Sequence, residues 1–405
     1  MEDSSSSRGA GDTTPSLDTM LVRGGLRRSE FGETSEAIFL TSGFVYESAA
    51  AADARFAGDE PGYVYSRYAN PTLSVLEQRL AQVEGAEACH VTASGMAAVF
   101  TSLFCHLRAG DHVVASRALF GSCYVILDTI LPRYGIETTF VDGPDLEAWE
   151  EAMRPNTRAV FLETPANPTL ELVDIGAVAA IAHANGAKVF VDNVFATPLG
   201  QRPLELGADV VAYSATKHID GQGRCLGGAV LADAEFCNEH FMPYYRHTGP
   251  ALSPFNAWVL MKGLETLAVR LEREVASAQA LAEMAENHPA ARSVRYPFLP
   301  SHPQYELARR QMKNGGTLVA LDLGTKEAAF AFMDALRIVD ISNNLGDTRT
   351  LATHPMTTTH RAMSEEARRS MGIGDGLVRL SVGLEGRDDL LNDVARALDA
   401  ARRVS

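Results

Sequence analysis

The sequence contains few cysteines, and their spacing builds neither a disulfide framework nor a metal site. Its 405 residues include five cysteines, at positions 89, 105, 123, 225 and 237, with no Cys-x-x-Cys pair. Most of them lie in apolar segments, as the reduced and buried cysteines of cytoplasmic proteins do. His354 and His360 flank a threonine run without ligand-like companions. We therefore expect a cytoplasmic protein and no metal site.

The sequence also lacks an excess of positive charge and any long apolar run. The formal net charge is −15 at pH 7, and no basic cluster is dense enough to hold a phosphate backbone, which argues against nucleic acid and anionic membranes as partners. No apolar run could span a bilayer, and the first residues lack the basic and apolar regions of a signal peptide. With 46% hydrophobic residues, the chain can instead bury a large core, which we expect to be divided over two domains.

Strand and helix patterns alternate from residue 88 to residue 232. Short apolar runs predict strands, which lie at 88–92, 112–116, 136–141, 159–163, 188–191, 209–213 and 228–232. Helical patterns lie between them, at 94–106, 121–133, 146–153 and 175–184. This alternation predicts an α/β fold with a mostly parallel central sheet and helices on both of its faces.

The remaining segments flank this region. Residues 1–18 are rich in Ser, Gly and Thr and are expected to be disordered, and residues 21–57 are expected to form an arm that lies on another surface. A long helical stretch over 252–288, interrupted at Gly263, leads to a smaller C-terminal α+β domain. That domain's strands and helices are expected near 317–323, 326–336, 338–342, 364–370, 377–382 and 389–402. The tail with its arm, the large domain and the C-terminal domain are predicted at 1–72, 73–265 and 266–405.

The most informative stretch follows the strand expected over 209–213. That strand ends in Ser214-Ala-Thr216-Lys217. Core packing does not explain why a lysine close to two hydroxyl residues should directly follow a strand. One interpretation is an ordinary lysine in a polar surface loop, and the other is a chemical role. The arrangement suits an imine between Lys217 and an aldehyde cofactor whose phosphate the hydroxyls hold.

Two features of this stretch imitate a dehydrogenase. Tyr213 and Lys217 have the Tyr-x-x-x-Lys spacing of the short-chain dehydrogenases, and Gly221-x-Gly223-x-x-x-Gly227 is similar to a dinucleotide fingerprint. A dehydrogenase needs that tyrosine and lysine on a helix, and its glycines between the first strand and the first helix. Because Tyr213 closes a strand and Gly227 precedes another, we disfavour this interpretation.

Asp192 ends the apolar run 189–191 and is the second main candidate. On its own it is as well explained as a helix cap. Paired with Lys217, it suits a carboxylate that keeps a pyridine nitrogen protonated, which makes the ring an electron sink. Ligands of parallel sheets gather at the carboxyl ends of the strands. We therefore expect one rim to carry Ser94, Asn167, Asp192, Ser214 and Lys217.

Weaker candidates for the same site lie near two predicted helix starts. Ser94-Gly95-Met96 places a capping serine and free amide hydrogens where a phosphate can bind, although any helix start offers this. Phe120, beside Gly121, either stacks on a flat ring or belongs to the core.

Two arginines are candidates for binding anions. Tyr65 and Arg67 lie in an extended segment outside the sheet, where Arg67 either reaches a phosphate or is a surface arginine. Arg379 lies inside the apolar strand 377–380. Because burying an arginine is costly unless it is paired, we favour a substrate carboxylate as the partner of Arg379.

Together these residues make the sequence similar to a known family. From about residue 21 to about residue 390 it resembles the pyridoxal-phosphate enzymes of cysteine and methionine metabolism, which include cystathionine γ-synthase, the cystathionine lyases, methionine γ-lyase and the homoserine sulfhydrylases. The motifs that carry the resemblance are, in order, Tyr65-Ser-Arg67-Tyr-Ala-Asn-Pro-Thr72, Ser94-Gly-Met96, Glu163-Thr-Pro-Ala-Asn-Pro-Thr169, Asp192-Asn-Val-Phe-Ala-Thr-Pro198, Ser214-Ala-Thr-Lys217 and Arg379-Leu-Ser-Val-Gly-Leu-Glu385.

The resemblance implies an aspartate-aminotransferase-like fold (type I), pyridoxal 5′-phosphate as cofactor, and a homotetramer of two tight dimers with shared active sites. It makes Lys217 the imine-forming lysine and proton shuttle, and Asp192 the partner of the ring nitrogen. The implied cofactor contacts are Ser94, Gly95, Met96, Phe120, Ser214 and Thr216, together with Tyr65 and Arg67 from the arm of the neighbouring subunit. The implied substrate contacts are Asn167, Asn344 and Arg379.

Departures from the family's usual residues point to one branch. Gly221-Gln-Gly-Arg-Cys-Leu-Gly-Gly228 stands where synthases and lyases usually carry Gly-His-Ser-Asp, and Asn343-Asn344-Leu-Gly346 replaces the common Ser-Leu-Gly. Phe120 stands where most members stack a tyrosine. The branch that these departures resemble carries out γ-replacement on O-succinyl-L-homoserine with sulfide, which implies L-homocysteine and succinate as products, in methionine biosynthesis.

Other functions stay open at this point. Cystathionine γ-synthase uses the same donor with cysteine as the acceptor, and an O-acetylhomoserine sulfhydrylase differs only in the acyl group. A γ-lyase of cystathionine or methionine would release a keto acid and ammonia. A non-catalytic cofactor-binding protein is disfavoured because Lys217, Asp192 and Arg379 are all present.

Overall fold

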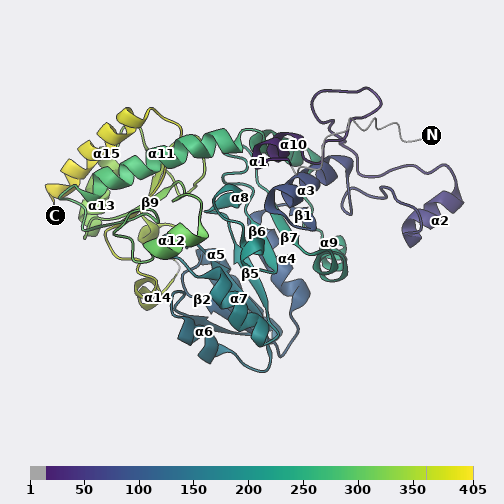
Figure 1. Cartoon of the computed structure of the whole chain (residues 1–405), viewed down its shortest axis with the longest axis horizontal. Helices are drawn as coiled ribbons and strands as arrows, with labels where there is room; N and C mark the ends of the chain where they lie inside the picture. The colour runs from purple at the N-terminus through teal and green to yellow at the C-terminus, as the bar shows by residue number, and fades with distance from the viewer. Residues whose placement is uncertain (1–14, 362, 405) are drawn as a thin grey trace.

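Two β-sheets, one of seven strands and one of five, organise the chain. The computed structural model describes residues 15–361 and 363–404, so residues 1–14 of the expected disordered tail lie outside the described residues. Figure 1 shows the long helix α11 (Leu267–Glu286) running from the C-terminal part of the molecule toward α1 (Leu17–Arg23) and α10 (Pro254–Leu264).

The seven-stranded sheet is mostly parallel, as the alternating patterns predict. Its order is β1-β7-β6-β5-β4-β2-β3, and only β7 runs antiparallel to its neighbours, β1 and β6, among the described strands. Its strands are β1 (Ala88–Thr92), β2 (His112–Ser116), β3 (Glu137–Val141), β4 (Thr157–Glu163), β5 (Lys188–Asp192), β6 (Val210–Tyr213) and β7 (Gly228–Ala232). Since β4, β5 and β6 are parallel, their carboxyl ends lie at one edge of the sheet.

Successive residues of each central strand enter two different hydrophobic cores, so the sheet is covered on both faces. In β4, Val160 and Leu162 belong to one core, and Ala159 and Phe161 belong to the other. The first core is completed by α3 (Pro71–Glu84), α6 (Leu146–Ala152), α7 (Ile175–Ala184) and α10. The second is completed by α4 (Gly95–His106), α5 (Gly121–Val125), η1 (Ile126–Ile130), η2 (Leu131–Tyr134), η4 (Phe236–Phe241) and α9 (Met242–Thr248). The single helix expected over 121–133 is therefore divided into α, π and 3₁₀ turns.

The smaller sheet has the order β10-β11-β12-β9-β8 and is packed by α11, α13 and α15. Its strands are β8 (Ser293–Arg295), β9 (Leu318–Asp322), β10 (Asp340–Ile341), β11 (Leu351–Thr353) and β12 (Leu377–Ser381), and its helices include α12 (Tyr305–Gln311), α13 (Lys326–Ala335), α14 (Glu365–Ser370) and α15 (Arg387–Arg402). The short turns α8 (Thr197–Gly200), η3 (Pro203–Leu206) and η5 (Pro355–Thr357) connect other elements. This agrees with the expected C-terminal α+β region.

The helical stretch between the two sheets differs from the prediction in where it breaks. The interruption lies at residues 265–266, between α10 and α11, and Gly263 is inside α10. A Cβ at Gly263 would lie 2.1 Å from the carbonyl oxygen of Ile219, so this glycine serves close packing rather than a break. Leu271 of α11 belongs to the core of the large sheet, and Leu281 to that of the small sheet. The domain boundary at 265/266 stays a prediction.

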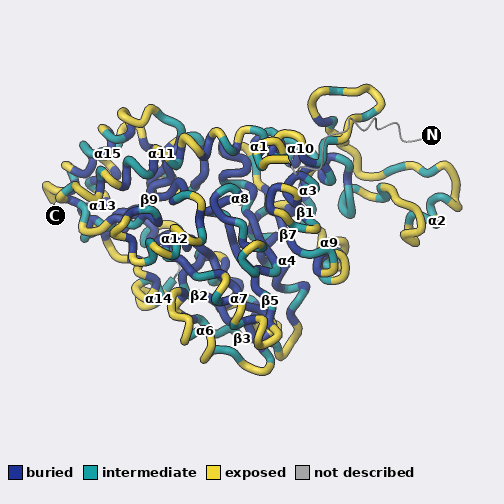
Figure 2. Tube along the Cα trace, in the orientation of Figure 1, coloured by how far each residue is buried: buried dark blue, intermediate teal, exposed yellow. Residues whose placement is uncertain are grey.

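The N-terminal segment contradicts the sequence prediction at one point. Helix α1 begins at Leu17, so residues 17 and 18 are not disordered; the hydroxyl of Ser16 caps its first turn, and Leu21 is buried against α3. The chain then extends away from the body, through α2 (Ala49–Ala57), and is mostly exposed (Figure 2). Phe31 is 86% exposed and Val45 93% exposed. No helix in the described part of the chain has the length and apolar character needed to cross a membrane.

Candidate active site

A cavity of about 340 Å³ lies where β4, β5 and β6 end. Most of the residues singled out from the sequence line it together. They are Ser94, Gly95, Met96, Phe120, Asn167, Asp192, Ser214, Thr216, Lys217 and Arg379. Asn344 reaches the same place through its contact with Lys217. The expectation that Ser94, Asn167, Asp192, Ser214 and Lys217 gather at one rim of the sheet agrees with the structure, and Arg379 reaches the same cavity from β12 of the smaller sheet.

Lys217 follows β6 and extends its amine into this cavity. Its Nζ atom donates a hydrogen bond to Oδ1 of Asn344 at 2.6 Å. Burial, helped by the positive charge of Arg379, lowers the pKa of Lys217 to about 8. A much larger fraction of this amine is therefore neutral near pH 7 to 8 than for a lysine in water.

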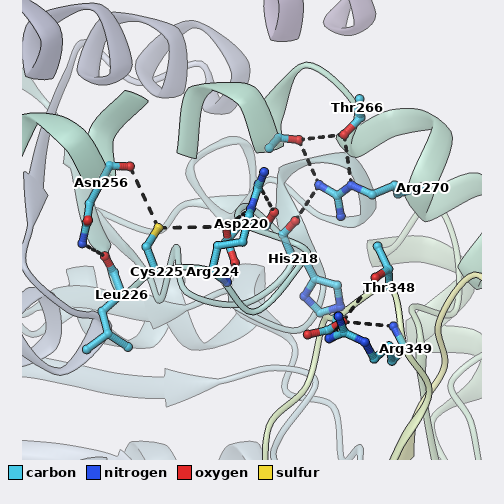
Figure 3. Close-up of polar contacts among 12 residues, drawn as sticks. His218, Asp220, Arg224, Cys225, Leu226, Asn256, Thr266, Arg270, Thr348 and Arg349 are labelled. Carbon is cyan, nitrogen blue, oxygen red and sulfur yellow. Dashed lines mark hydrogen bonds and ion pairs between the residues drawn. The ribbon is translucent and has the colours of Figure 1, made fainter. Parts of the chain in front are cut away.

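The loop after Lys217 is held by hydrogen bonds from Arg270 of α11 and from the segment that contains Thr348 (Figure 3). Nη2 of Arg270 donates to the carbonyl oxygen of His218 at 2.9 Å, and Nε donates to Oγ1 of Thr266 at 3.2 Å. Gly221 has φ +67°, and a Cβ there would lie 2.1 Å from Nη1 of Arg270. The backbone N–H of Thr348 donates to the carbonyl oxygen of Gly221 at 3.0 Å. These contacts fix the backbone that carries the lysine.

Asp192 is the last residue of β5 and lies in register with Glu163, the last residue of β4. Its Oδ1 atom accepts a hydrogen bond from the N–H of Val194 at 3.1 Å, so it shapes a turn and does not cap a helix. Burial raises the pKa of the Asp192 carboxyl to about 6. The carboxylate faces the cavity with only one backbone donor bound to it among the described residues.

The start of α4 forms another wall of the cavity. The Ser94 hydroxyl accepts from the N–H of Ala97 at 3.1 Å, which leaves the first amides of the helix, at Gly95 and Met96, without an intrahelical partner. A Cβ at Gly95 would lie 2.5 Å from Cβ of Ser214, so glycine alone permits this close approach. Thr216 accepts from the N–H of Gly227 at 3.0 Å. Helix dipole and free amides make this wall suitable for an anion.

Arg379 lies in β12 and is 1% exposed. Its Nη1 donates to Oδ1 of Asn167 at 2.8 Å, and its Nη2 donates to the carbonyl oxygens of Asn343 and Asn344, each at 3.1 Å. Its Nε atom is buried and has no hydrogen-bond partner in the described part of the chain. Burial lowers the pKa of Arg379 to about 10, which leaves it charged at neutral pH. Within the described residues no carboxylate forms an ion pair with this guanidinium, so it can receive a carboxylate from a ligand.

Tyr65 and Arg67 do not line this cavity. Tyr65 is 42% exposed, and the Arg67 guanidinium lies 4.8 Å from the centroid of the Tyr68 ring and donates to the carbonyl oxygen of Arg246 at the end of α9. Their expected place, in the site of a neighbouring subunit, stays a prediction.

The sequence did not indicate Glu163 as a site residue; it appears there only as the first residue of the motif over 163–169. The structure places Glu163 on the cavity wall, together with Asn343 and Thr359. One signal was available, because Glu163 ends an apolar run just as Asp192 does, and the two runs form adjacent parallel strands. Asn343 and Thr359 come from irregular segments, where no periodic pattern marks a position.

Comparison with known proteins identifies the family. The model of the family described as Cys/Met metabolism PLP-dependent enzyme matches residues 18–399. The chain is 60% identical to an O-succinylhomoserine sulfhydrylase of Mycobacterium tuberculosis, over 94% of this chain and 95% of that protein. It is 52% identical to an O-succinylhomoserine sulfhydrylase of Pseudomonas aeruginosa, over 95% of each. An L-methionine gamma-lyase of Treponema denticola is 43% identical, over 93% of this chain and 95% of that protein.

Solved structures agree with this assignment. A Campylobacter jejuni protein described as an O-acetylhomoserine (thiol)-lyase, which contains a pyridoxyl-lysine phosphate, superposes with a TM-score of 0.91 at 32% identity and covers 95% of this chain and 99% of its own. A cystathionine gamma-lyase of Lactobacillus plantarum, complexed with L-serine, has a TM-score of 0.90 at 32% identity and covers 96% of this chain and 100% of its own. The fold is thus that of the type I PLP-dependent enzymes, as the sequence predicts. The chain belongs to the family of Cys/Met metabolism PLP-dependent enzymes, and its cofactor is pyridoxal phosphate.

Proposed function

We propose that this chain catalyses γ-replacement on O-succinyl-L-homoserine with sulfide, which yields L-homocysteine and succinate. The observation that carries this proposal is the high identity, 60% and 52%, to proteins named O-succinylhomoserine sulfhydrylase, whereas the L-methionine gamma-lyase of Treponema denticola is 43% identical. The cavity supports it by placing an amine, an acid and an unpaired buried guanidinium together.

The residues of the cavity fit pyridoxal phosphate. The wall at Gly95 and Met96 offers free amides to a phosphate, and Ser214 and Thr216 stand beside it. We assign Ser94, Phe120 and Asp192 to the same cofactor, where the Asp192 carboxylate would keep the ring nitrogen protonated. When bound, pyridoxal phosphate supplies an aldehyde that reacts with a primary amine and a ring that withdraws electrons from the substrate's α-carbon.

Lys217 is proposed as the group that moves protons. Its Nζ atom has a lowered pKa, so the neutral amine is present in quantity near neutral pH to take a proton from the substrate's α-carbon and return one later. Asn344 is suited to hold that amine when it is not covalently engaged, since its Oδ1 accepts from Nζ in this structure. Burial, and after it the positive charge of Arg379, keeps the pKa of Lys217 low.

Arg379 and Asn167 are proposed to bind the substrate's α-carboxylate. The buried Nε of Arg379 has no hydrogen-bond partner among residues 15–361 and 363–404, and its other nitrogens are held by Asn167 and by the backbone of residues 343 and 344. A guanidinium fixed in this way presents a preorganised donor to a carboxylate. Binding there would remove the cost of an unpaired buried charge.

The arm is proposed to act in another subunit of a cytoplasmic homotetramer. Its exposed apolar side chains, including Phe31, Leu40 and Val45, have no surface to cover them within the described chain. Tyr65 and Arg67 lie in the last part of the arm, just before α3, and do not line the cavity of their own chain. A neighbouring copy would bury the apolar residues. Its cavity would receive these two side chains beside Gly95 and Met96, where the phosphate is proposed to bind.

The experiment that tests the function combines two donors with two acceptors. O-succinyl- and O-acetyl-L-homoserine are each supplied with sulfide or with cysteine, and the products are identified by mass spectrometry. The proposal expects homocysteine and succinate from the succinyl donor with sulfide as the fastest reaction. Faster turnover with cysteine would assign a cystathionine γ-synthase, and a keto acid with ammonia from methionine or cystathionine would assign a γ-lyase.

A further inference from the structure

Glu163 is a buried carboxylate on the cavity wall to which the reaction proposed above gives no role. It is the last residue of β4, is 3% exposed and pairs in register with Asp192 of β5. Two carboxylates at the ends of adjacent strands, both shielded from water, repel each other and lose hydration. Such an arrangement persists in a folded protein when specific donors compensate for it.

The donors that bind Glu163 come from two different segments of the cavity wall. Oε2 accepts from the backbone N–H of Phe120 at 2.6 Å, and Oε1 accepts from the backbone N–H of Asn167 at 2.9 Å. Phe120 immediately precedes α5, whereas Asn167 lies in the turn after β4. One side chain therefore ties together two irregular segments that no β-ladder connects.

The contact with Asn167 continues to Arg379. The N–H of Asn167 is held by Glu163, and Oδ1 of the same residue accepts from Nη1 of Arg379 at 2.8 Å. Burial and the nearby Asp192 raise the pKa of Glu163 well above its usual range, and the two backbone donors together with the positive charge of Arg379 oppose this rise. Glu163 thus supports one side of the guanidinium, through Asn167, while the carbonyl oxygens of Asn343 and Asn344 hold the other side.

We propose that Glu163 is a positioning residue of the active site, which holds the Phe120 wall and the Asn167–Arg379 pair in one fixed arrangement. The inference rests on the proposed function only in the role of Arg379 toward the substrate's carboxylate. Both oxygens of Glu163 must accept hydrogen bonds for this role. A glutamine of the same shape offers only one acceptor, so it can keep one of the two contacts.

The test compares Glu163→Gln and Glu163→Asp with Glu84→Gln in the holoenzyme. Glu84 is a matched control because it is equally buried but lies in α3, away from the cavity lining. Hydrogen exchange at the amides of Phe120 and Asn167, the visible circular dichroism of the bound cofactor, and KM for O-succinylhomoserine are measured. We expect faster exchange in at least one of the two segments, an altered dichroism band and a rise in KM of about tenfold, with a smaller change in kcat, for both Glu163 variants. Glu84→Gln should change none of these.

A second comparison tests the route through Asn167. If Glu163 acts on Arg379 through this residue, the double variant Glu163→Gln/Asn167→Ala should raise KM no further than the larger of the two single effects. Additive effects would contradict the route. Wild-type exchange and dichroism in Glu163→Gln, or in Glu163→Asp if the glutamine variant does not fold, would overturn the proposal. Since exchange and dichroism require no turnover, they test Glu163 even if the true substrate is another amino acid.

Discussion

The cavity and the N-terminal arm both carry residues expected for the same active site, and they have opposite environments. At the cavity, Asp192, Asn167 and Arg379 are at most 8% exposed and are held by specific hydrogen bonds. On the arm, Tyr65 and Arg67 contact only surface groups, and the apolar side chains nearby face solvent. The cavity is therefore lined by residues of one chain, whereas the role expected of the arm depends on a second subunit and stays a prediction.

This difference in burial means that the two regions carry different energetic costs. Burying a lysine, two carboxylates and an arginine around one cavity is costly, and a bound ligand of complementary charge offsets that cost. The arm bears less of this cost, because its one buried carboxylate, Glu36, is paired with Arg79 and Lys262 among the described residues. The exposed apolar residues of the arm are instead unfavourable in water, since they stabilise the protein only when another surface covers them.

The largest expected effect is the loss of the amine in the cavity. Lys217→Ala should reduce kcat by at least about a thousandfold and abolish the visible absorption of the covalently held cofactor, because no other amine lines the cavity among the described residues. Absorption spectra and the rate of homocysteine formation check this. Lys188→Ala, which removes a lysine of β5 that lies outside the cavity lining, is the control and should retain both.

The next effect concerns the buried guanidinium. Arg379→Gln should raise KM for the amino-acid substrate by about tenfold to a hundredfold, because a charge-assisted contact with a carboxylate is lost. It should also raise the pKa of Lys217 above about 8, because the repulsion by Arg379 disappears. The pH dependence of amine labelling at Lys217 in the apoprotein measures this shift. Arg154→Gln, at an exposed ion pair, should change neither quantity, and an unshifted labelling profile in Arg379→Gln would contradict this account.

A subunit-mixing experiment sharpens the contrast between the cavity and the arm. Arg67→Ala should weaken cofactor binding by about tenfold, through the loss of a phosphate contact. If the arm acts across subunits, mixing Arg67→Ala with Lys217→Ala subunits should restore activity, because a mixed oligomer contains one site with both residues. The rate after refolding the two variants together is the measurement. No regain of activity, with mixed oligomers present, would place the arm's action within its own chain.

The smallest expected effect is on the pH dependence of the unfolding free energy, which a buried glutamate should change and an exposed glutamate of the arm should not. Burial raises the pKa of Glu84 from its usual 4.5 to about 8, so the folded protein holds a proton there that the unfolded chain releases above about 4.5. The resulting stabilisation is complete below that pH and is lost as the pH rises toward 8. Glu84→Gln should make the fall of the unfolding free energy shallower by up to about 1.4 kcal/mol per pH unit in this window.

Denaturant unfolding at pH 5, 6, 7 and 8 measures this slope in wild type and variant. Glu60→Gln, at an exposed position of the arm, is the control and should leave the slope unchanged. Equal slopes for wild type and Glu84→Gln would show that Glu84 titrates similarly in the folded and unfolded states.

Much of the large sheet could be predicted because its strands are buried on both faces. Runs such as 159–163 and 188–191 are apolar throughout, which marks central parallel strands and places their last residues at one edge. Asp192 and Lys217 were found in this way. Strands β8 and β11, of three residues each, are too short to show a period and were missed.

Other features depend on contacts between distant segments. Glu163 binds the backbone of Phe120 and Asn167, and backbone donors leave no pattern in the sequence. Gly263 was predicted as a helix break, yet it serves packing against the carbonyl of Ile219, which only the tertiary structure places there. The expected place of Arg67 in a neighbouring subunit stays a prediction, because assembly rather than local sequence would set it.

The most direct test locates the cofactor's covalent attachment. The holoenzyme is reduced with borohydride and digested, and the modified peptide is sequenced by mass spectrometry. We expect one pyridoxyl group per chain, on Lys217. A pyridoxyl group on another lysine, or a reduced protein that carries none after incubation with excess pyridoxal phosphate, would contradict it.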